Sequence, residues 1–168
     1  TLKNVPGQSV MDMKFPNAPH GLKMACGENP KRFYGSQGRA PSTRMGNVAG
    51  YRAAWIAASD YRDTMNAAAN GEGEAPIRDL QLETLAGVLN GEILVHNHCY
   101  RADEMSVMLE IAKEVGYKVT AFHHGAEAYK IADLLRENDT CAAIWADWYG
   151  FKMEAFDGIR ENAAILDR

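Results

Sequence analysis

Two apolar runs, each ending in a pair of histidines, constrain this chain more than any other feature of its sequence. The first run ends in His96 and His98, and the second ends in His123 and His124. Runs this apolar are typical of strands buried in a parallel sheet. Because alternate side chains of a strand point to opposite faces, His96 and His98 share a face, whereas His123 and His124 point apart. We expect His123 to pack outward towards a helix.

Neighbouring strand ends that carry imidazoles bring nitrogen ligands together from positions far apart in the sequence. Catalytic zinc sites are commonly assembled in this way. The competing interpretation is that these are ordinary polar residues at strand ends, whose ring nitrogens bond the backbone. Repetition of the pattern at both ends favours the metal site, because function concentrates at the C-terminal ends of parallel strands.

The rest of the chain alternates between predicted strands and helices. We expect strands over 21–26, 92–97, 118–123 and 141–146, and helices over 43–70, 79–90, 103–115 and 126–138. A polar, glycine-rich loop is expected over 27–41, and a weakly helical stretch over 151–167. This succession predicts an α/β fold built from parallel β/α units, with the sheet covered on both sides. An open doubly wound sheet and a (β/α) barrel both satisfy it.

Length and composition fit a single domain over 1–168. The chain is 46% hydrophobic and 24% charged, which allows a sizeable core. Its net charge of -4, without basic runs, gives no reason to expect a nucleic-acid partner. No apolar run approaches the roughly 18 residues of a membrane span, so we expect no membrane partner either. A small-molecule substrate is the expected partner.

The cysteines indicate the expected redox environment. Cys26, Cys99 and Cys141 are odd in number and far apart, so no disulfide framework is predicted. Each is expected to be a small buried hydrophobe. Cysteines used in this way indicate a reducing compartment, and we therefore expect a cytoplasmic protein.

Three segments together resemble the imidazolonepropionase-like branch of the metal-dependent amidohydrolases. They are Leu22-Lys-Met-Ala-Cys-Gly-Glu-Asn-Pro-Lys-Arg32, Val95-His-Asn-His-Cys-Tyr-Arg-Ala-Asp-Glu104 and His123-His-Gly-Ala-Glu-Ala-Tyr129. The resemblance covers nearly the whole chain from about Lys14 onward. It implies a (β/α)8 TIM barrel with one or two divalent metals, expected to be zinc, at the mouth formed by the C-terminal ends of the strands.

The resemblance also implies roles for individual residues. The ligand that bridges the metals after the fourth barrel strand matches Lys23 or Glu28, and both alternatives remain open. His96 matches the ligand after the fifth strand, and His124 matches the ligand after the sixth. His98, on the same face as His96, and Arg101, whose guanidinium fits a carboxylate, are the candidates for substrate binding.

Two parts of the family's ligand pattern, a histidine pair and an aspartate, have no counterpart here. No His-x-His pair lies upstream of residue 23, and no strand follows Asp167 to supply the last aspartate. The chain therefore resembles barrel strands four to seven, the central part of a longer amidohydrolase. Four parallel strands cannot close a barrel. They must form an open sheet, pair with a second copy in a homo-oligomer, or belong to a longer molecule.

The expected function is metal-dependent hydrolysis of a carbon–nitrogen bond, in a cyclic amide or a peptide-like substrate, by metal-activated water. The alternative is a catalytically incomplete structural fragment that binds a metal weakly at most. A doubly wound nucleotide-binding domain has less support, because no strand is followed by the glycine fingerprint that cradles phosphate.

Overall fold

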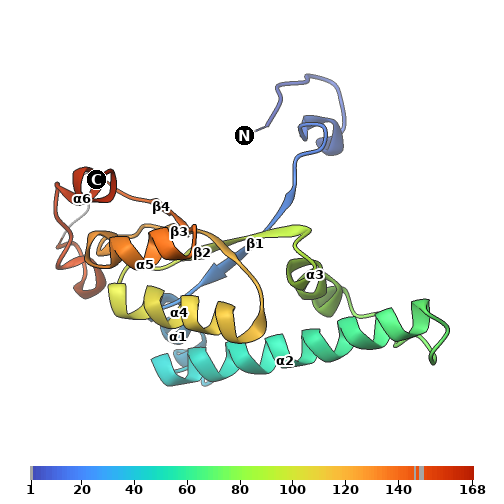
Figure 1. The fold of residues 1–168 in the computed structure, drawn as a ribbon. Helices are drawn as coiled ribbons and strands as arrows, with labels where there is room; N and C mark the ends of the chain where they lie inside the picture. Colours follow the sequence, from blue (N-terminus) through green and yellow to red (C-terminus); the bar gives the residue numbers. More distant parts are fainter. Residues whose placement is uncertain (1, 146, 148–149) are drawn as a thin grey trace.

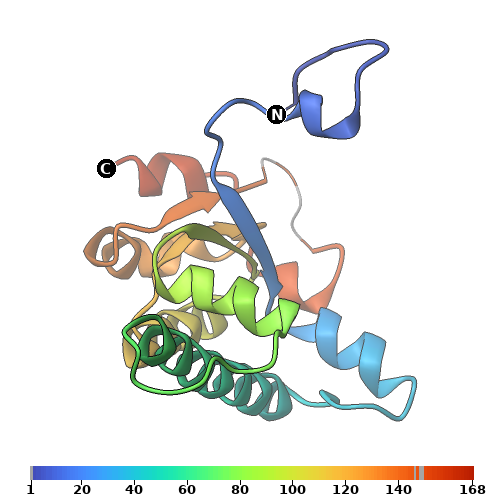
Figure 2. The same cartoon turned by 90° about the vertical axis from the view of Figure 1, so that its right-hand side faces the viewer.

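Four parallel strands form the centre of the fold, in the order in which they occur along the chain. The computed structural model describes residues 2–145, 147 and 150–168. The strands are β1 (His20–Ala25), β2 (Ile93–His98), β3 (Val119–His123) and β4 (Cys141–Ala143), as Figures 1 and 2 show. The predicted α/β fold with a parallel sheet is confirmed. Strand β4 is shorter than the expected 141–146, of which residue 146 lies outside the described residues.

Helix ends fall where the sequence supplies caps. Helix α2 (Arg44–Ala69) begins after Thr43, whose side chain accepts a hydrogen bond of 2.9 Å from the Gly46 N–H. Helix α4 (Ala102–Val115) ends at Gly116, which has the left-handed φ of 89° that favours glycine at this position. These boundaries lie within one residue of the predicted ones, because capping is decided by local chemistry.

Two predicted segments differ from the structure. The expected loop 27–41 contains a helix, α1 (Glu28–Gly35), and the expected helix 126–138 is divided into a 3-10 helix, η2 (Ala128–Ile131), and α5 (Ala132–Glu137). The glycines and the proline of the first segment are typical of loops, and for that reason its helix was not predicted. The remaining elements are α3 (Leu80–Leu89), α6 (Asn162–Leu166) and the 3-10 helices η1 (Val10–Met13) and η3 (Met153–Ala155).

One face of the sheet packs into the core. Val95 and Phe122 are completely buried on this face, and they belong to one cluster with Met105 and Met108 of α4. Trp55 of α2 joins the same cluster. Helices α2 and α4 thus cover the apolar side of the strands, and Figure 1 shows both on the same side of the sheet.

The other face of the sheet is not covered in the same way. Lys23 is exposed there, on an edge strand of the described sheet, and His96, His98 and His123 are partly exposed. The expectation of a sheet covered on both sides is therefore wrong for the described part of the chain. Because side chains alternate, Val95 and Asn97 of β2 face the core, whereas His96 and His98 face the opposite way.

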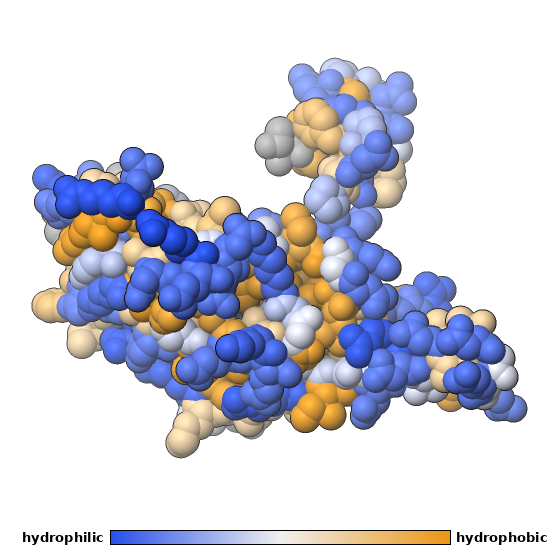
Figure 3. Space-filling model, viewed as in Figure 1, coloured by the Kyte–Doolittle hydropathy of each residue, from blue (hydrophilic) through white to orange (hydrophobic). Residues whose placement is uncertain are grey.

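The surface has two further features. The N-terminal segment that carries η1 extends away from the rest of the molecule (Figures 1 and 2). Apolar side chains interrupt the hydrophilic surface in Figure 3, and large side chains such as Ile77, Met45 and Phe156 are exposed. Among the described residues, none of the helices combines the length and the apolar composition that crossing a membrane would require.

We expect Trp55→Ala to lower the free energy of unfolding by about 3–5 kcal/mol, because it empties a large buried site. Trp55 is 2% exposed, and its ring stacks on Tyr117 at 4.3 Å between centroids. Ile56→Ala on the same helix is the control, since Ile56 is 62% exposed. This substitution should lower the free energy of unfolding by less than about 0.5 kcal/mol. Urea denaturation measures both; equal losses would contradict this assignment of the core.

Candidate functional site

The C-terminal ends of β1, β2 and β3 lie side by side, and this arrangement gathers the histidines. In the strand register Lys23 is paired with His96, Ala25 with His98, and His98 with His123. Because these strands run parallel and their last residues are paired in the register, residues far apart in the sequence reach one rim of the sheet. Four of the five histidines of the chain lie at this rim, as the sequence predicts.

The rings of His98 and His124 are in contact. Their centroids are 4.6 Å apart, at an interplanar angle of 65°. His124 follows the end of β3 and has a left-handed φ of 62°, so strand alternation no longer decides its direction. Tyr100 stacks on His124 from one side at 5.8 Å, and Trp145 stacks at 5.2 Å and donates a hydrogen bond to His124 Nδ1. His98 and His124 thus form a pair of imidazoles in contact with each other, and the aromatic rings of Tyr100 and Trp145 pack against this pair.

A second pair lies beside the first. His96 Nδ1 and His123 Nε2 are 2.9 Å apart, a hydrogen bond between two rings. The expectation that His123 packs outward towards a helix is therefore wrong. His123 directly opposes His98 in the register and shares the polar face, because the register shifts at a bulge between Val95 and His96.

Burial and neighbouring cations lower the pKa values of His98, His123 and His124. Burial lowers the pKa of His98 to about 4, and nearby His124 and Lys23 add to the effect. The pKa values of His123 and His124 are lowered as well, first by burial and then by Lys23. A neutral imidazole is the form that binds a metal, so the donors are in the required state at neutral pH.

Glu28 begins α1 directly after β1 and lies within reach of a lysine from the C-terminal segment. Lys152 Nζ is 3.2 Å from the Glu28 carboxylate and 3.1 Å from the Glu154 carboxylate. The same ammonium lies 4.0 Å from the centre of the Tyr100 ring. Because Tyr100 also contacts His98 and His124, Lys152 links Glu28 to the imidazole pair.

Three residues of this neighbourhood were not singled out from the sequence. Asn29 Nδ2 lies 2.8 Å from His98 Nε2, and the backbone N–H of Glu28 donates to the buried carboxylate of Glu154. Lys152 is the third. Glu154 and Lys152 lie in a stretch with weak helical periodicity, more than 120 residues from Glu28, so no local pattern could place them. The only available signal for Asn29 was its position next to Glu28.

Arg101, the other candidate for substrate binding, forms an ion pair at the start of α4. Its guanidinium donates to Asp103 at 2.9 Å, at the start of α4, and its side chain is 40% exposed. This short-range ion pair lies at the first turn of the helix. The structure therefore brings His96, His98, His123 and His124 together and leaves Arg101 engaged with its own helix.

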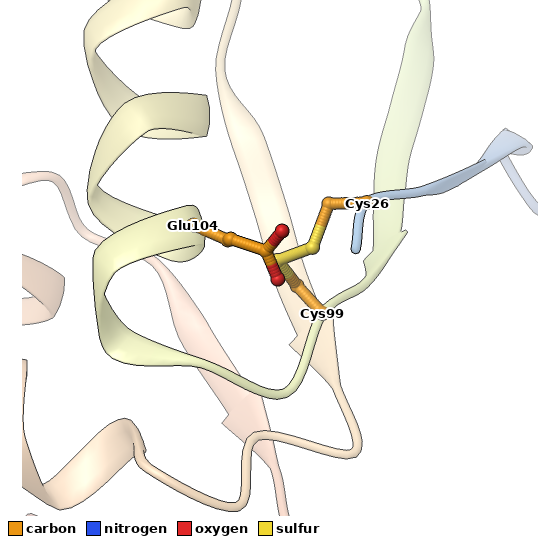
Figure 4. A group of neighbouring side chains, drawn as sticks. All are labelled: Cys26, Cys99 and Glu104. Atoms are coloured by element: carbon orange, nitrogen blue, oxygen red, sulfur yellow. A yellow bond between two sulfur atoms is a disulfide. The ribbon is translucent and has the colours of Figure 1, made fainter. Parts of the chain in front are cut away.

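The cysteines also differ from expectation. Cys26 and Cys99 form a disulfide, and Cys141 is exposed rather than buried. Sequence distance was misleading, because the two cysteines directly follow β1 and β2 and so are neighbours in the sheet. The reducing compartment was expected because no disulfide was predicted, and this disulfide removes that reason. Figure 4 shows Glu104 beside the disulfide; its carboxylate and the two sulfurs lie within 4.8 Å of one another.

The donors at the rim are of the types that bind a divalent metal, whereas the one group of three donor atoms within 4.8 Å of one another among the described residues is Cys26, Cys99 and Glu104. Neutral imidazoles and a carboxylate are the ligands that zinc takes in catalytic sites, and the rim offers His98, His124 and Glu28, with His96 and Lys23 beside them. The two sulfurs beside Glu104 are bonded to each other and cannot serve as thiolate ligands in this state.

Comparison with known proteins identifies two relatives. The amidohydrolase tasK of Hapsidospora irregularis is 32% identical over 157 residues, which cover 86% of this chain and 16% of that protein. The crystal structure of an amidohydrolase from Thermotoga maritima superposes with a TM-score of 0.85 at 34% identity, covering 94% of this chain and 41% of the other. No protein-family model matches the chain. The chain thus spans less than half the length of either relative.

We expect Glu154→Gln to lower the free energy of unfolding by about 1–3 kcal/mol, because a buried charged acceptor is replaced by a neutral one. Glu154 is 2% exposed and pairs with Arg44 at 3.2 Å and with Lys152 at 3.1 Å. Glu161→Gln, at an exposed position of the same segment, is the matched control and should change little. Thermal and urea unfolding measure both; indistinguishable variants would show that Glu154 does not hold this segment in place.

Proposed function

We propose that this chain is part of a metal-dependent hydrolase of carbon–nitrogen bonds. Its two relatives support membership of the amidohydrolase superfamily. The observation that carries the proposal is the contact between the His98 and His124 rings at the C-terminal rim of the sheet. On the three sequence motifs, we assign it to the imidazolonepropionase-like branch. The substrate class is a small molecule with a cyclic amide or a peptide-like bond.

The geometry favours a particular set of ligands. His98, rather than His96, lies against His124, and Glu28 is tied to the same neighbourhood through Lys152. We therefore propose His98, His124 and Glu28 as metal ligands, with zinc as the ion. His96, bonded to His123, lies next to them and is the alternative to His98. Lys23 is the alternative to Glu28.

A divalent ion at this rim would supply Lewis-acid polarisation of the scissile carbonyl and activation of water at neutral pH. The residues of the chain prepare the donors for it. Asn29 fixes the orientation of the His98 ring through Nε2. Glu154 holds the backbone of Glu28 in place, and the Lys152 ammonium pairs with the carboxylates of both Glu28 and Glu154. Supporting contacts of this kind typically change metal affinity by about 10–100-fold.

We further propose that the four strands are one arc of a (β/α)8 barrel. The polar face that carries the histidines would then line the interior of the barrel, and the face packed on α2 and α4 would be its outside. The order β1-β2-β3-β4 supports this, since it is the sequential, all-parallel order that a barrel uses. The β1 and β4 edges of the described sheet would pair with further strands, supplied by a longer chain or a second copy.

Metal binding tests the ligand assignment. The purified protein is dialysed against zinc, and its metal content is measured by emission spectroscopy. We expect His98→Ala and His124→Ala each to lower zinc affinity at least tenfold, because each removes a ligand. His20→Ala is the control, since His20 is the histidine outside the rim and contacts Lys14 at 3.0 Å.

The outcomes separate the alternatives. A loss of zinc affinity in His96→Ala but not in His98→Ala would show that β2 supplies His96, not His98, as the metal ligand. No bound zinc in the unaltered protein after dialysis would favour the catalytically incomplete structural piece over the hydrolase.

Activity tests the hydrolase itself. The protein translated from the complete reading frame is assayed with cyclic amides and dipeptide-like amides. We expect His124→Ala to lower kcat/KM by at least a factor of about 100, because the ligand acts in the transition state. His20→Ala should leave kcat/KM unchanged. Unaltered turnover in His98→Ala and His124→Ala would eliminate the proposal.

A further inference from the structure

The disulfide lies at the rim of the sheet, beside the candidate ligands but outside the set that we assign to the metal. Cys26 directly follows β1 and Cys99 directly follows β2, and their Cα atoms are 5.2 Å apart. The backbone continues these strands one residue further, since Cys26 N–H donates to His98 O at 2.9 Å. The pair therefore joins the two strand ends that lead to Glu28 and His98.

The carboxylate of Glu104 lies beside this disulfide. Glu104 Oε1 accepts from Arg44 Nε at 2.7 Å, whereas Oε2 is buried and has no hydrogen-bond partner among the described residues. A carboxylate oxygen of Glu104 lies within 4.8 Å of both sulfurs (Figure 4). A buried acceptor without a donor costs free energy. A disulfide offers Oε2 no donor, but a thiol would, so reduction supplies the partner that the oxidised form lacks.

Cys26 lines a cavity that opens to the outside. This cavity of about 760 Å³ between α2 and α4 is lined by Cys26, Gly27, Asn47, Tyr51, Glu104 and Met108. Cys26 is 5% exposed and Cys99 is completely buried. A small dithiol that enters this cavity therefore meets the sulfur of Cys26 first.

From this geometry we infer that Cys26 and Cys99 form a redox-active dithiol–disulfide site, whose substrates are small dithiols and disulfides and whose reduced form is stabilised by Glu104. A thiolate of the dithiol attacks Cys26 Sγ, the Cys26–Cys99 bond breaks, and its electron pair leaves on Cys99 Sγ, which takes up a proton. The second thiolate of the reductant then attacks the reductant sulfur of the mixed disulfide. Cys26 leaves and is protonated, and the reductant departs as a cyclic disulfide, so two electrons and two protons are transferred. A small disulfide reverses the reaction.

The test counts thiols in a Cys141→Ser background, so that the exposed free cysteine does not contribute. The protein is equilibrated in native buffer with mixtures of reduced and oxidised dithiothreitol, and thiols are trapped by alkylation and counted by mass spectrometry. We expect zero alkylated thiols at the oxidising end and two at the reducing end, reversibly and without loss of helical circular dichroism. Thiols that appear only in denaturant would overturn the proposal.

Glu104→Gln tests the role of the carboxylate. A neutral amide accepts a hydrogen bond more weakly than a carboxylate does, so the equilibrium should shift about five- to tenfold towards the disulfide. Glu114→Gln is the matched control, because Glu114 also joins α4 to α2, through Arg52 at 2.7 Å, but is exposed. An equal shift in both variants, or no shift in Glu104→Gln, would overturn the part assigned to Glu104.

An effect of the disulfide on the metal site rests on the proposed function, whereas the thiol count tests the redox site by itself. If the bond holds the two strand ends together, reduction should speed amide hydrogen exchange in peptides that contain Glu28 and His98, and leave peptides from α3 unchanged. Unchanged exchange together with reversible thiol chemistry would overturn the connection while the redox site stands. Loss of the metal site in the tests above would leave the thiol result intact.

Discussion

The packing of Val95 and Phe122 against α4 is the constraint on which the rest of this structure depends. Both side chains are completely buried. Because the side chains of a strand alternate, burying these two residues leaves the histidines of β2 and β3 on the opposite face. A slip of one residue in either strand would exchange the two faces. The hydrophobic effect thus positions the polar rim without any direct attraction among its members.

A second constraint acts where β1 passes into α1. Gly27 has a φ of 77°, and a Cβ at this position would lie 2.4 Å from the Glu154 carboxylate. Only glycine allows the buried carboxylate to approach the backbone so closely and to accept from Glu28 N–H. Arg44 and Lys152 compensate its charge. Three segments distant in sequence therefore meet at the point where Glu28 is presented.

The sites described here share one structural origin, the common rim of a parallel sheet. The imidazoles of His98 and His124, the carboxylate of Glu28 and the disulfide all lie at the last residue of a strand or within three residues after it. Such a rim concentrates different chemistries in a small space because each strand delivers its next few residues to the same place. A change in the bond between strand ends is therefore well placed to influence the ligands next to it.

The sequence alone determined the elements whose causes are local. Capping by Thr43 and Gly116, the apolar periodicity of α2 and α4, and the strand-like runs before the histidines predicted the parallel α/β fold and the histidine-rich rim. The same local reasoning failed for α1, where Pro30 and the glycines masked a helix that tolerates proline in its first turn.

Only the tertiary structure decided which side chains meet. It paired His98 with His124 and His96 with His123, joined Cys26 to Cys99, and brought Glu154 to Glu28. The physical reason is that these contacts depend on strand register, on a bulge and on the return of a C-terminal segment. All three are set by packing over the whole chain, and a local sequence pattern carries no record of them.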